Sequence, residues 1–188
     1  MAHYTFAQFT REVDALVRGQ GQPDVLVGLI QPLLSRLLTR RDWLDEKYRR
    51  PAPGKSYTQY LLSMPPDEAW SVVSFVWPEG ATTPVHDHDT WGVIGVYQGQ
   101  EHETRYKVVE GSIAARRVRL VETATATMYP GEVGRVVPPD DLHRVSNDGH
   151  ALAVSVHVYG TNIGTQKRHV IDLATGEVRD FVSGYDTP

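Results

Sequence analysis

Two histidines, His86 and His88, lie two residues apart between Gly80 and Gly99. On a strand this spacing puts both imidazoles on one face, and two neutral ring nitrogens are half of a site for Fe, Zn, Ni, Cu or Mn. A third ligand has to come from another segment, and His143, which follows a proline-rich turn after a predicted strand, is the candidate. An H-x-H pair alone is a weak signal, but the second histidine motif in a β-rich region strengthens the prediction of a metal site.

The other histidines have no such context. We expect His3, His102 and His150 at the solvated surface, the usual place for this residue type, and we assign no metal role to His169. Trp91 follows the H-x-H pair closely, and it fits equally well in the wall of the site or in the core.

A second group of polar side chains recurs along the segment Leu152–Tyr159. Ser155, His157 and Tyr159 occupy every second position, so on a strand they share one face while valines occupy the other. If the polar face is buried, the three side chains have to hydrogen-bond to one another, which predicts a relay that aims the Tyr159 hydroxyl at the metal. The alternative is an edge strand whose polar face is turned to solvent.

The first fifty residues predict helices. Thr5 and Gln8 form a capping-box signature, followed by apolar residues at helical spacing. A second helical run follows Asp24, the predicted N-cap, and Pro32 inside it predicts a kink or a late start. Asp42 is expected to open a short third turn.

After the helix-breaking segment Pro51–Gly54, short Val-, Ile- and Tyr-rich runs alternate with turn residues, which favours an antiparallel sandwich or barrel. We expect one structural domain, with a helical segment 1–50 packed outside a barrel 51–188. The expected strands are Ala69–Trp77, Val93–Tyr97, Thr104–Val109, Ile113–Val121, Val133–Val137, Leu152–Tyr159, His169–Leu173 and Val178–Val182, with a turn at Glu110-Gly111.

Composition excludes several classes of protein. The 188 residues carry a net charge of −4 and contain no cysteine, and the pI is about 6.0. A chain of this charge shows no basic footprint for nucleic acid, and disulfides or thiolate metal sites cannot form. No apolar run approaches the roughly 20 residues of a membrane span, and no secretory signal is evident. We therefore expect a cytoplasmic protein with no nucleic-acid or membrane partner; its oligomeric state stays open.

The two histidine motifs resemble those of the cupin superfamily, small double-stranded β-helix barrels with a central metal. The segment from Gly80 through His86 and His88 to Gly99 matches the first cupin motif, and Pro138–Asn147 with His143 matches the second, with Asp140 in place of its glycine. The acidic ligand of the first motif is missing, since Gly92 stands near its place. The resemblance therefore implies three neutral imidazoles only. A divalent metal held this way keeps its full charge and deprotonates a bound thiol, which points toward thiol dioxygenases.

The Ser155-x-His157-x-Tyr159 strand resembles the cysteine dioxygenase family of cupins, over roughly residues 55–170. In the animal members a cysteine near the Gly92 position is crosslinked to the tyrosine, and this chain can form no such link. Those enzymes also hold the substrate carboxylate with an arginine, and Gln59 stands in its place here.

The Gln59 pattern resembles a bacterial branch of the family that oxidises 3-mercaptopropionate, in which an arginine at the Arg168 position binds the carboxylate. A guanidinium grips a carboxylate through two parallel hydrogen bonds. Gln59 cannot pair with an anion, but it can hydrogen-bond a polar part of the substrate.

These resemblances imply Fe(II) held by His86, His88 and His143, a substrate thiol fixed by Arg168 and Gln59, and a relay of Ser155, His157 and Tyr159. Thiol and O2 would give a sulfinic acid, with 3-mercaptopropionate favoured. L-Cysteine or mercaptosuccinate is an alternative substrate. A diketone dioxygenase, which gives Arg168 no role, and a non-catalytic small-molecule-binding cupin are alternative classes.

Overall fold

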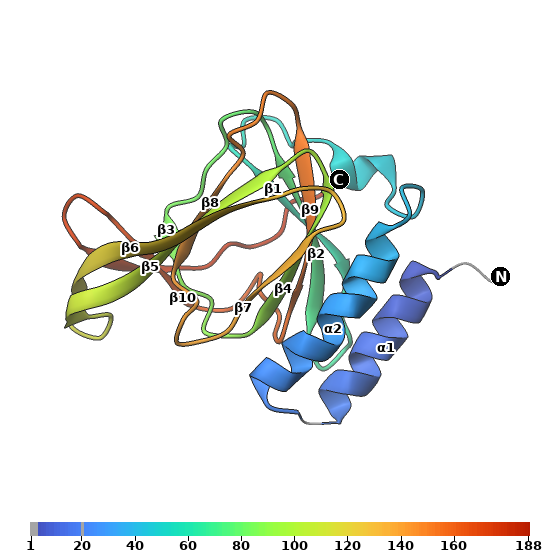
Figure 1. The fold of residues 1–188 in the computed structure, drawn as a ribbon, viewed down its shortest axis with the longest axis horizontal. Coiled ribbons are helices and arrows are strands. Elements are labelled where there is room, and N and C mark those ends of the chain that lie inside the picture. Colours follow the sequence, from blue (N-terminus) through green and yellow to red (C-terminus); the bar gives the residue numbers. More distant parts are fainter. Residues whose placement is uncertain (1–3, 20) are drawn as a thin grey trace.

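Two antiparallel sheets face each other and form a barrel, with two helices along one outer side (Figure 1). This computed structural model describes residues 4–19 and 21–188. The helices are α1 (Phe6–Arg18), α2 (Pro23–Leu38) and the 3-10 helix η1 (Glu46–Arg49). One sheet has the order β1 (Thr58–Ser63), β2 (Ser71–Trp77), β9 (Ala153–Tyr159), β4 (Gly92–Gln98), β7 (Val133–Val136). The other has the order β11 (Val178–Phe181), β10 (Arg168–Ile171), β3 (Val85–His86), β8 (His143–Ser146), β5 (Glu101–Ser112), β6 (Arg117–Met128).

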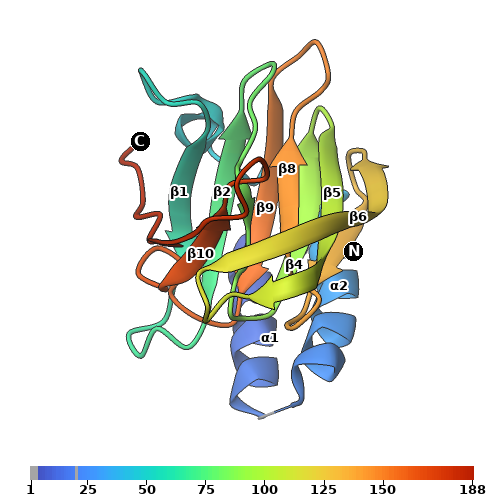
Figure 2. The same ribbon diagram turned by 90° about the vertical axis from the view of Figure 1, so that its left-hand side faces the viewer.

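The expected fold class, a mainly β cupin barrel with N-terminal helices outside it, is confirmed by this arrangement. When the molecule is viewed from the side of β6 and β10, the helices lie behind the strands (Figure 2). None of the helices in the described part of the chain has the length and apolar character that a membrane crossing requires.

The helices cover the outer face of the five-stranded sheet. Their apolar side chains and those of the sheet form one buried cluster, which removes both faces from water. Gly95 on β4 permits close approach of α2, because a Cβ there would lie 2.5 Å from Leu38 Cδ1 and 2.9 Å from Leu34 Cδ2. The fully buried members of this cluster include Phe9, Val13, Ile30, Leu34, Leu37, Val93, Val154, Val156 and Val158.

The first helix begins as expected and the second does not. Thr5 Oγ1 accepts a hydrogen bond from the Gln8 N–H, and the Gln8 side chain accepts one from the Thr5 N–H, so the capping box is confirmed. The N-cap of α2 is Gln22 rather than Asp24, which lies in the first turn, where its carboxylate favours the positive end of the helix dipole. The helix starts at its first-turn proline and continues through Pro32, so a late start is wrong.

Two other local expectations are wrong. The short helix η1 is capped by Asp45, whose carboxylate accepts from the Lys47 N–H, and it does not begin at Asp42. The chain between β5 and β6 turns at residues 113–116, where the Arg116 N–H bonds to the Ile113 carbonyl. The expected turn at Glu110-Gly111 lies inside the long strand β5 instead.

Candidate metal centre

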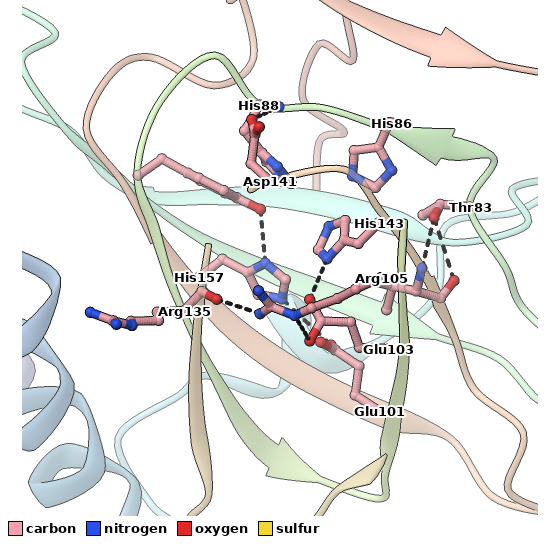
Figure 3. Close-up of polar contacts among 12 residues, drawn as sticks. Thr83, His86, His88, Glu101, Glu103, Arg105, Arg135, Asp141, His143 and His157 are labelled. Atoms are coloured by element: carbon pink, nitrogen blue, oxygen red, sulfur yellow. Dashed lines mark hydrogen bonds and ion pairs between the residues drawn. The ribbon is translucent and has the colours of Figure 1, made fainter. Parts of the chain in front are cut away.

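Three buried histidines meet inside the barrel. His86 on β3 pairs directly with His143 on β8, and His88 follows two residues after His86. Their possible ligand atoms all lie within 4.8 Å of one another, and Figure 3 shows the three rings close together. The structure therefore brings the three predicted ligands into one group that can hold a metal ion.

The spacing of the two histidines suggested that both lie on one strand. His88 lies outside it, because β3 ends at His86. A carboxylate from the second motif holds it in place. Asp141 Oδ2 accepts hydrogen bonds from the N–H groups of His88 (2.8 Å) and Asp89 (3.2 Å). Asp141, in the turn that precedes His143, thus fixes the backbone of His88. These hydrogen bonds connect the two histidine motifs without the help of a metal ion.

The protonation of these rings suits a metal. Burial, then the neighbouring His143, holds the pKa of both His86 and His88 well below the usual value, which keeps the rings neutral, the form that ligates metals. His86 Nδ1 lies 3.1 Å from the Pro84 carbonyl. Since a carbonyl only accepts, Nδ1 carries the proton and Nε2 is free to ligate.

His143 is held in the same way by a carboxylate. Its Nδ1 lies 2.6 Å from Glu103 Oε1, the arrangement that orients a ligating histidine and raises its basicity. Burial alone would raise the pKa of Glu103, but the hydrogen bond with His143 and the charge of Arg105 outweigh it, and the net shift is downward. By contrast, Nδ1 of His88 is buried and has no hydrogen-bond partner in the described part of the chain. Three imidazole ligands grouped in this way fit a divalent transition metal.

Gly92 explains why this group contains no carboxylate. It pairs with Tyr159 across β4 and β9, and a Cβ there would lie 2.9 Å from Val136 Cγ2 and 3.0 Å from Tyr159 Cε1. An acidic side chain at this position would collide with the tyrosine ring and its neighbour.

The polar side chains of β9 form a continuous chain of hydrogen bonds. Trp77 Nε1 donates to Ser155 Oγ (2.9 Å), Ser155 Oγ lies 2.8 Å from His157 Nε2, and His157 Nδ1 lies 2.8 Å from the Tyr159 hydroxyl. The Tyr159 ring stacks on His88, with the ring centroids 5.5 Å apart. The predicted contacts of the relay are present, and its last member touches the histidine group.

This chain is wholly inside the protein. Ser155, His157 and Tyr159 are at most 3% exposed, and β9 lies between β2 and β4 rather than at an edge. The edge-strand alternative is therefore wrong. Burial raises the pKa of Tyr159 above its ordinary value, so the phenol keeps its proton.

A small cavity opens beside the histidines and the relay. Apolar and aromatic side chains form much of its wall, which limits the access of water, and polar groups from five strands converge on it. The lining residues are Tyr57, Gln59, Phe75, Trp77, Thr83, Pro84, His86, His143, Val145, His157, Tyr159, Arg168, Val170 and Phe181.

Arg168 contributes a buried cation to this wall. It is 4% exposed, and its guanidinium carbon lies 5.0 Å from the centroid of the Phe181 ring. Nη2 donates to Ser183 Oγ (2.9 Å), and Nε is buried without a hydrogen-bond partner among the described residues. No ion pair joins it to a carboxylate anywhere in residues 4–19 and 21–188. Burial lowers the pKa of Arg168, yet the group stays charged at neutral pH, so an unpaired cation faces the cavity.

Gln59 lies next to Arg168 through a shared hydroxyl. Its Nε2 donates to Ser183 Oγ at 3.2 Å, the same oxygen that accepts from Arg168. Ser183 Oγ in turn donates to the Ile163 carbonyl at 3.3 Å. Both predicted substrate-binding residues are therefore held on one side of the cavity.

The predictions for Trp91 and for the other histidines have different outcomes. Trp91 is 7% exposed and belongs to the helix–sheet core, outside the cavity wall. The side chain of His150 is 97% exposed, as expected, whereas His102 is half-buried and bonds Thr127 Oγ1 through Nδ1. His169 bonds Asp87. His3 lies outside the described residues.

Sequence reasoning missed the acidic residues around the site. Glu101 and Glu103 lie on β5, and the expected strand began only at Thr104. Glu101 and Glu103 occupy alternate positions of that strand and therefore share one face. Extending the predicted strand back from Thr104 toward Gly99 would have identified them. Asp141 and Ser183 carried no local signal, because their partners are distant in the chain.

The solved structures that resemble this chain include the following three. An uncharacterized conserved protein with a double-stranded β-helix domain from Klebsiella pneumoniae is 18% identical, with a TM-score of 0.45, over 65% of this chain and 91% of that one. A cupin-2 domain protein from Rhodospirillum rubrum is 13% identical, with a TM-score of 0.48, over 66% and 71%. An oxalate oxidase in complex with the substrate analogue glycolate is 17% identical, with a TM-score of 0.45, over 63% and 59%.

A family profile covers far more of the sequence. The profile of cysteine dioxygenase type I matches residues 5–170, which include the three histidines, the relay and Arg168. By this match the chain belongs to the cysteine dioxygenase type I family.

Proposed function

We propose that the protein is an iron-dependent thiol dioxygenase that converts a small carboxylated thiol, 3-mercaptopropionate before others, and O2 into the sulfinic acid. Membership in the family points to an oxidoreductase of the dioxygenase class. The observation that carries the choice of substrate is Arg168, a buried cation with no carboxylate partner in the described residues, on the wall of the cavity beside the histidines.

His86, His88 and His143 would hold the metal through neutral ring nitrogens. Fe(II) bound there would supply the redox chemistry that joins dioxygen to the thiol sulfur. The chain itself contributes apolar side chains to the cavity wall, among them Phe75 and Phe181, which help to exclude water. It also contributes Arg168 and Gln59, which are fixed in place and would hold the thiol in one orientation.

Arg168 is placed to bind the substrate carboxylate. A buried guanidinium that meets a carboxylate regains the hydrogen bonds and the counter-charge that burial took from it. Gln59, fixed beside it by Ser183, adds a neutral hydrogen-bonding group. A thiol with a carboxylate and no second charge fits this pair better than an amino acid does, because neither residue can balance an ammonium group.

Tyr159 supplies a neutral phenol to the wall of the same cavity. Because burial keeps its proton in place and His157 fixes its direction, the hydroxyl can hydrogen-bond the reacting groups without changing its charge.

The test is oxygen consumption by the purified protein, loaded with Fe(II) without air, with 3-mercaptopropionate, L-cysteine, mercaptosuccinate and cysteamine in parallel. We expect the fastest uptake with 3-mercaptopropionate and a sulfinate that carries both atoms of labelled O2. No uptake with any thiol, despite one iron per chain, would leave a diketone dioxygenase or a non-catalytic cupin.

Arg168→Gln tests the anchor. We expect the KM for 3-mercaptopropionate to rise by roughly 10- to 100-fold, the value of a charged hydrogen-bonded contact. Turnover of cysteamine, which has no carboxylate, should change little. Arg119→Gln, at an exposed arginine of β6, is the matched control. An equal loss of activity with 3-mercaptopropionate and with cysteamine would show that Arg168 does not bind the carboxylate.

A further inference from the structure

Glu101 is a buried carboxylate that the proposed reaction does not use. It is 2% exposed, and its Oε2 is buried and accepts no hydrogen bond from the residues that the structure describes. Within residues 4–19 and 21–188 its one ion-pair contact is with Nε2 of His157, at 3.5 Å. A buried carboxylate with so few partners costs free energy of folding, so its neighbour is the place to look for a role.

Glu101 and Glu103 act on two different histidines. They are two apart on β5 and therefore share a face of the sheet. Glu103 bonds Nδ1 of His143, the candidate ligand, while Glu101 faces Nε2 of His157, the centre of the relay. Figure 3 shows the two glutamates beside their histidines. In each pair the carboxylate lies beside one ring nitrogen of the histidine. The other ring nitrogen, Nε2 of His143 or Nδ1 of His157, does not contact the glutamate.

The heavy-atom distances in the relay permit two directions of hydrogen bonding. Trp77 Nε1 can only donate, so Ser155 Oγ accepts from it. In the first direction Ser155 then donates to His157 Nε2, and Nδ1–H donates to Tyr159. In the second, Nε2–H donates to Ser155 Oγ with Glu101 Oε2 3.5 Å from the same nitrogen, and Nδ1 accepts from the Tyr159 hydroxyl. Ser155 can donate or accept, so it does not decide between the two.

We infer that Glu101 is a positioning residue that keeps the ring proton of His157 on Nε2, so that Nδ1 accepts the hydrogen bond of the Tyr159 hydroxyl. A carboxylate oxygen has only lone pairs to offer. At 3.5 Å it attracts an N–H and repels the lone pair of a bare ring nitrogen. The second direction places the positive N–H beside the buried Oε2 in an ion-pair contact of 3.5 Å, and the first leaves Oε2 facing a lone pair.

The consequence deepens the proposed function and rests on it. With its hydrogen turned to His157, Tyr159 presents the lone pairs of its oxygen to the cavity. An arriving substrate thiol, which carries the S–H hydrogen, then meets an acceptor in place of a competing O–H donor. Burial and the charge of Glu101 both raise the pKa of Tyr159, consistent with a phenol that keeps this hydrogen.

The test reads the tautomer of His157 directly. The full-length protein, free of metal and labelled with 15N in its histidines, reports by ring-nitrogen NMR which nitrogen carries the proton. We expect Nε2–H in the native chain and at least a tenfold shift of the tautomer ratio toward Nδ1–H in Glu101→Leu. Glu101→Gln, which keeps an acceptor oxygen, should restore part of the native ratio.

Ser155→Ala is the matched control, since it removes the other neighbour of Nε2 and leaves Glu101 in place. The proton should stay on Nε2 in this variant. Nδ1–H in the native protein overturns the inference even if no Glu101 variant folds, and so does a tautomer ratio that Ser155→Ala changes and Glu101→Leu does not.

This readout needs neither iron nor turnover, so its failure is distinct from failure of the proposed function. In the iron-loaded enzyme, Glu101→Gln should lower kcat roughly tenfold, at the low end of indirect effects through an oriented histidine. KM should stay unchanged, because Glu101 does not line the cavity. A rise in KM with unchanged kcat would contradict the positioning role.

Discussion

The histidine group and the relay meet at one cavity but are built in different ways. The group combines two short strands and a loop, and the brace between His88 and Asp141 spans 53 residues of chain. The relay occupies three alternate positions of a single strand, β9, with fully buried valines on its other face.

The difference shows which bonds each part depends on. The residues of β9 are aligned by the two-residue period of any strand, and packing beneath the helices holds the strand in place. The histidines depend instead on specific polar contacts, from Asp141 to the backbone of His88 and from Glu103 to the ring of His143. Damage to one part should therefore leave the other intact.

His143→Ala should have the largest effect. It removes one of three neutral ligands, so we expect the loss of stoichiometric iron, measured by metal analysis after dialysis. His150→Ala, at an exposed histidine, should bind iron normally. The ring-nitrogen NMR signals of His157 should be unchanged in the metal-free variant. If they shift, the two parts are coupled and the comparison fails.

Tyr159→Phe breaks the relay and spares the histidine group. Loss of one positioned hydroxyl should lower kcat by roughly a hundredfold, while iron content stays at the native level. Oxygen uptake and metal analysis on the same preparation give both values. Loss of iron from this variant would assign Tyr159 a role in holding the metal.

Glu103→Gln sharpens the comparison within one strand. Replacing the carboxylate that orients His143 should weaken metal affinity by about 10- to 100-fold, measured by competition with a chelator. Glu101→Gln, on the same face of β5, should leave that affinity unchanged, because its partner belongs to the relay. Equal losses of metal affinity in the two variants would contradict the assignment of each glutamate to a different histidine.

The smallest effect is on the stability of the metal-free protein. Burial lowers the pKa of His86 and His88, so below about pH 6.5 the unfolded chain binds protons that the folded chain does not. Stability is therefore full above that pH and falls as the pH drops, by up to about 1.4 kcal/mol per pH unit for each histidine, until the lowered pKa is passed. Urea unfolding of the native chain and of His88→Gln should show a shallower slope for the variant, and identical slopes would contradict it.

Local patterns predicted much of the fold. The capping box, the central strands and the alternation along β9 are encoded in contiguous residues, since capping and strand period act over a few positions. Strands β1, β3 and β8 were not predicted. The strands β3 and β8 span two and four residues, too few for a period to appear, and they are defined by pairing with partners far along the chain.

The sequence by itself determined the types of side chain at the site, from the three histidines to the Ser155–His157–Tyr159 alternation, and the match over residues 5–170 that shows the family. Only the tertiary structure decided that Glu101 and Glu103 face two different histidines, that Ser183 holds both Gln59 and Arg168, and that Arg168 is buried without a carboxylate within the described chain. These contacts join side chains from separate strands and from the C-terminal segment. Their energies depend on distance and burial, which no local spacing specifies.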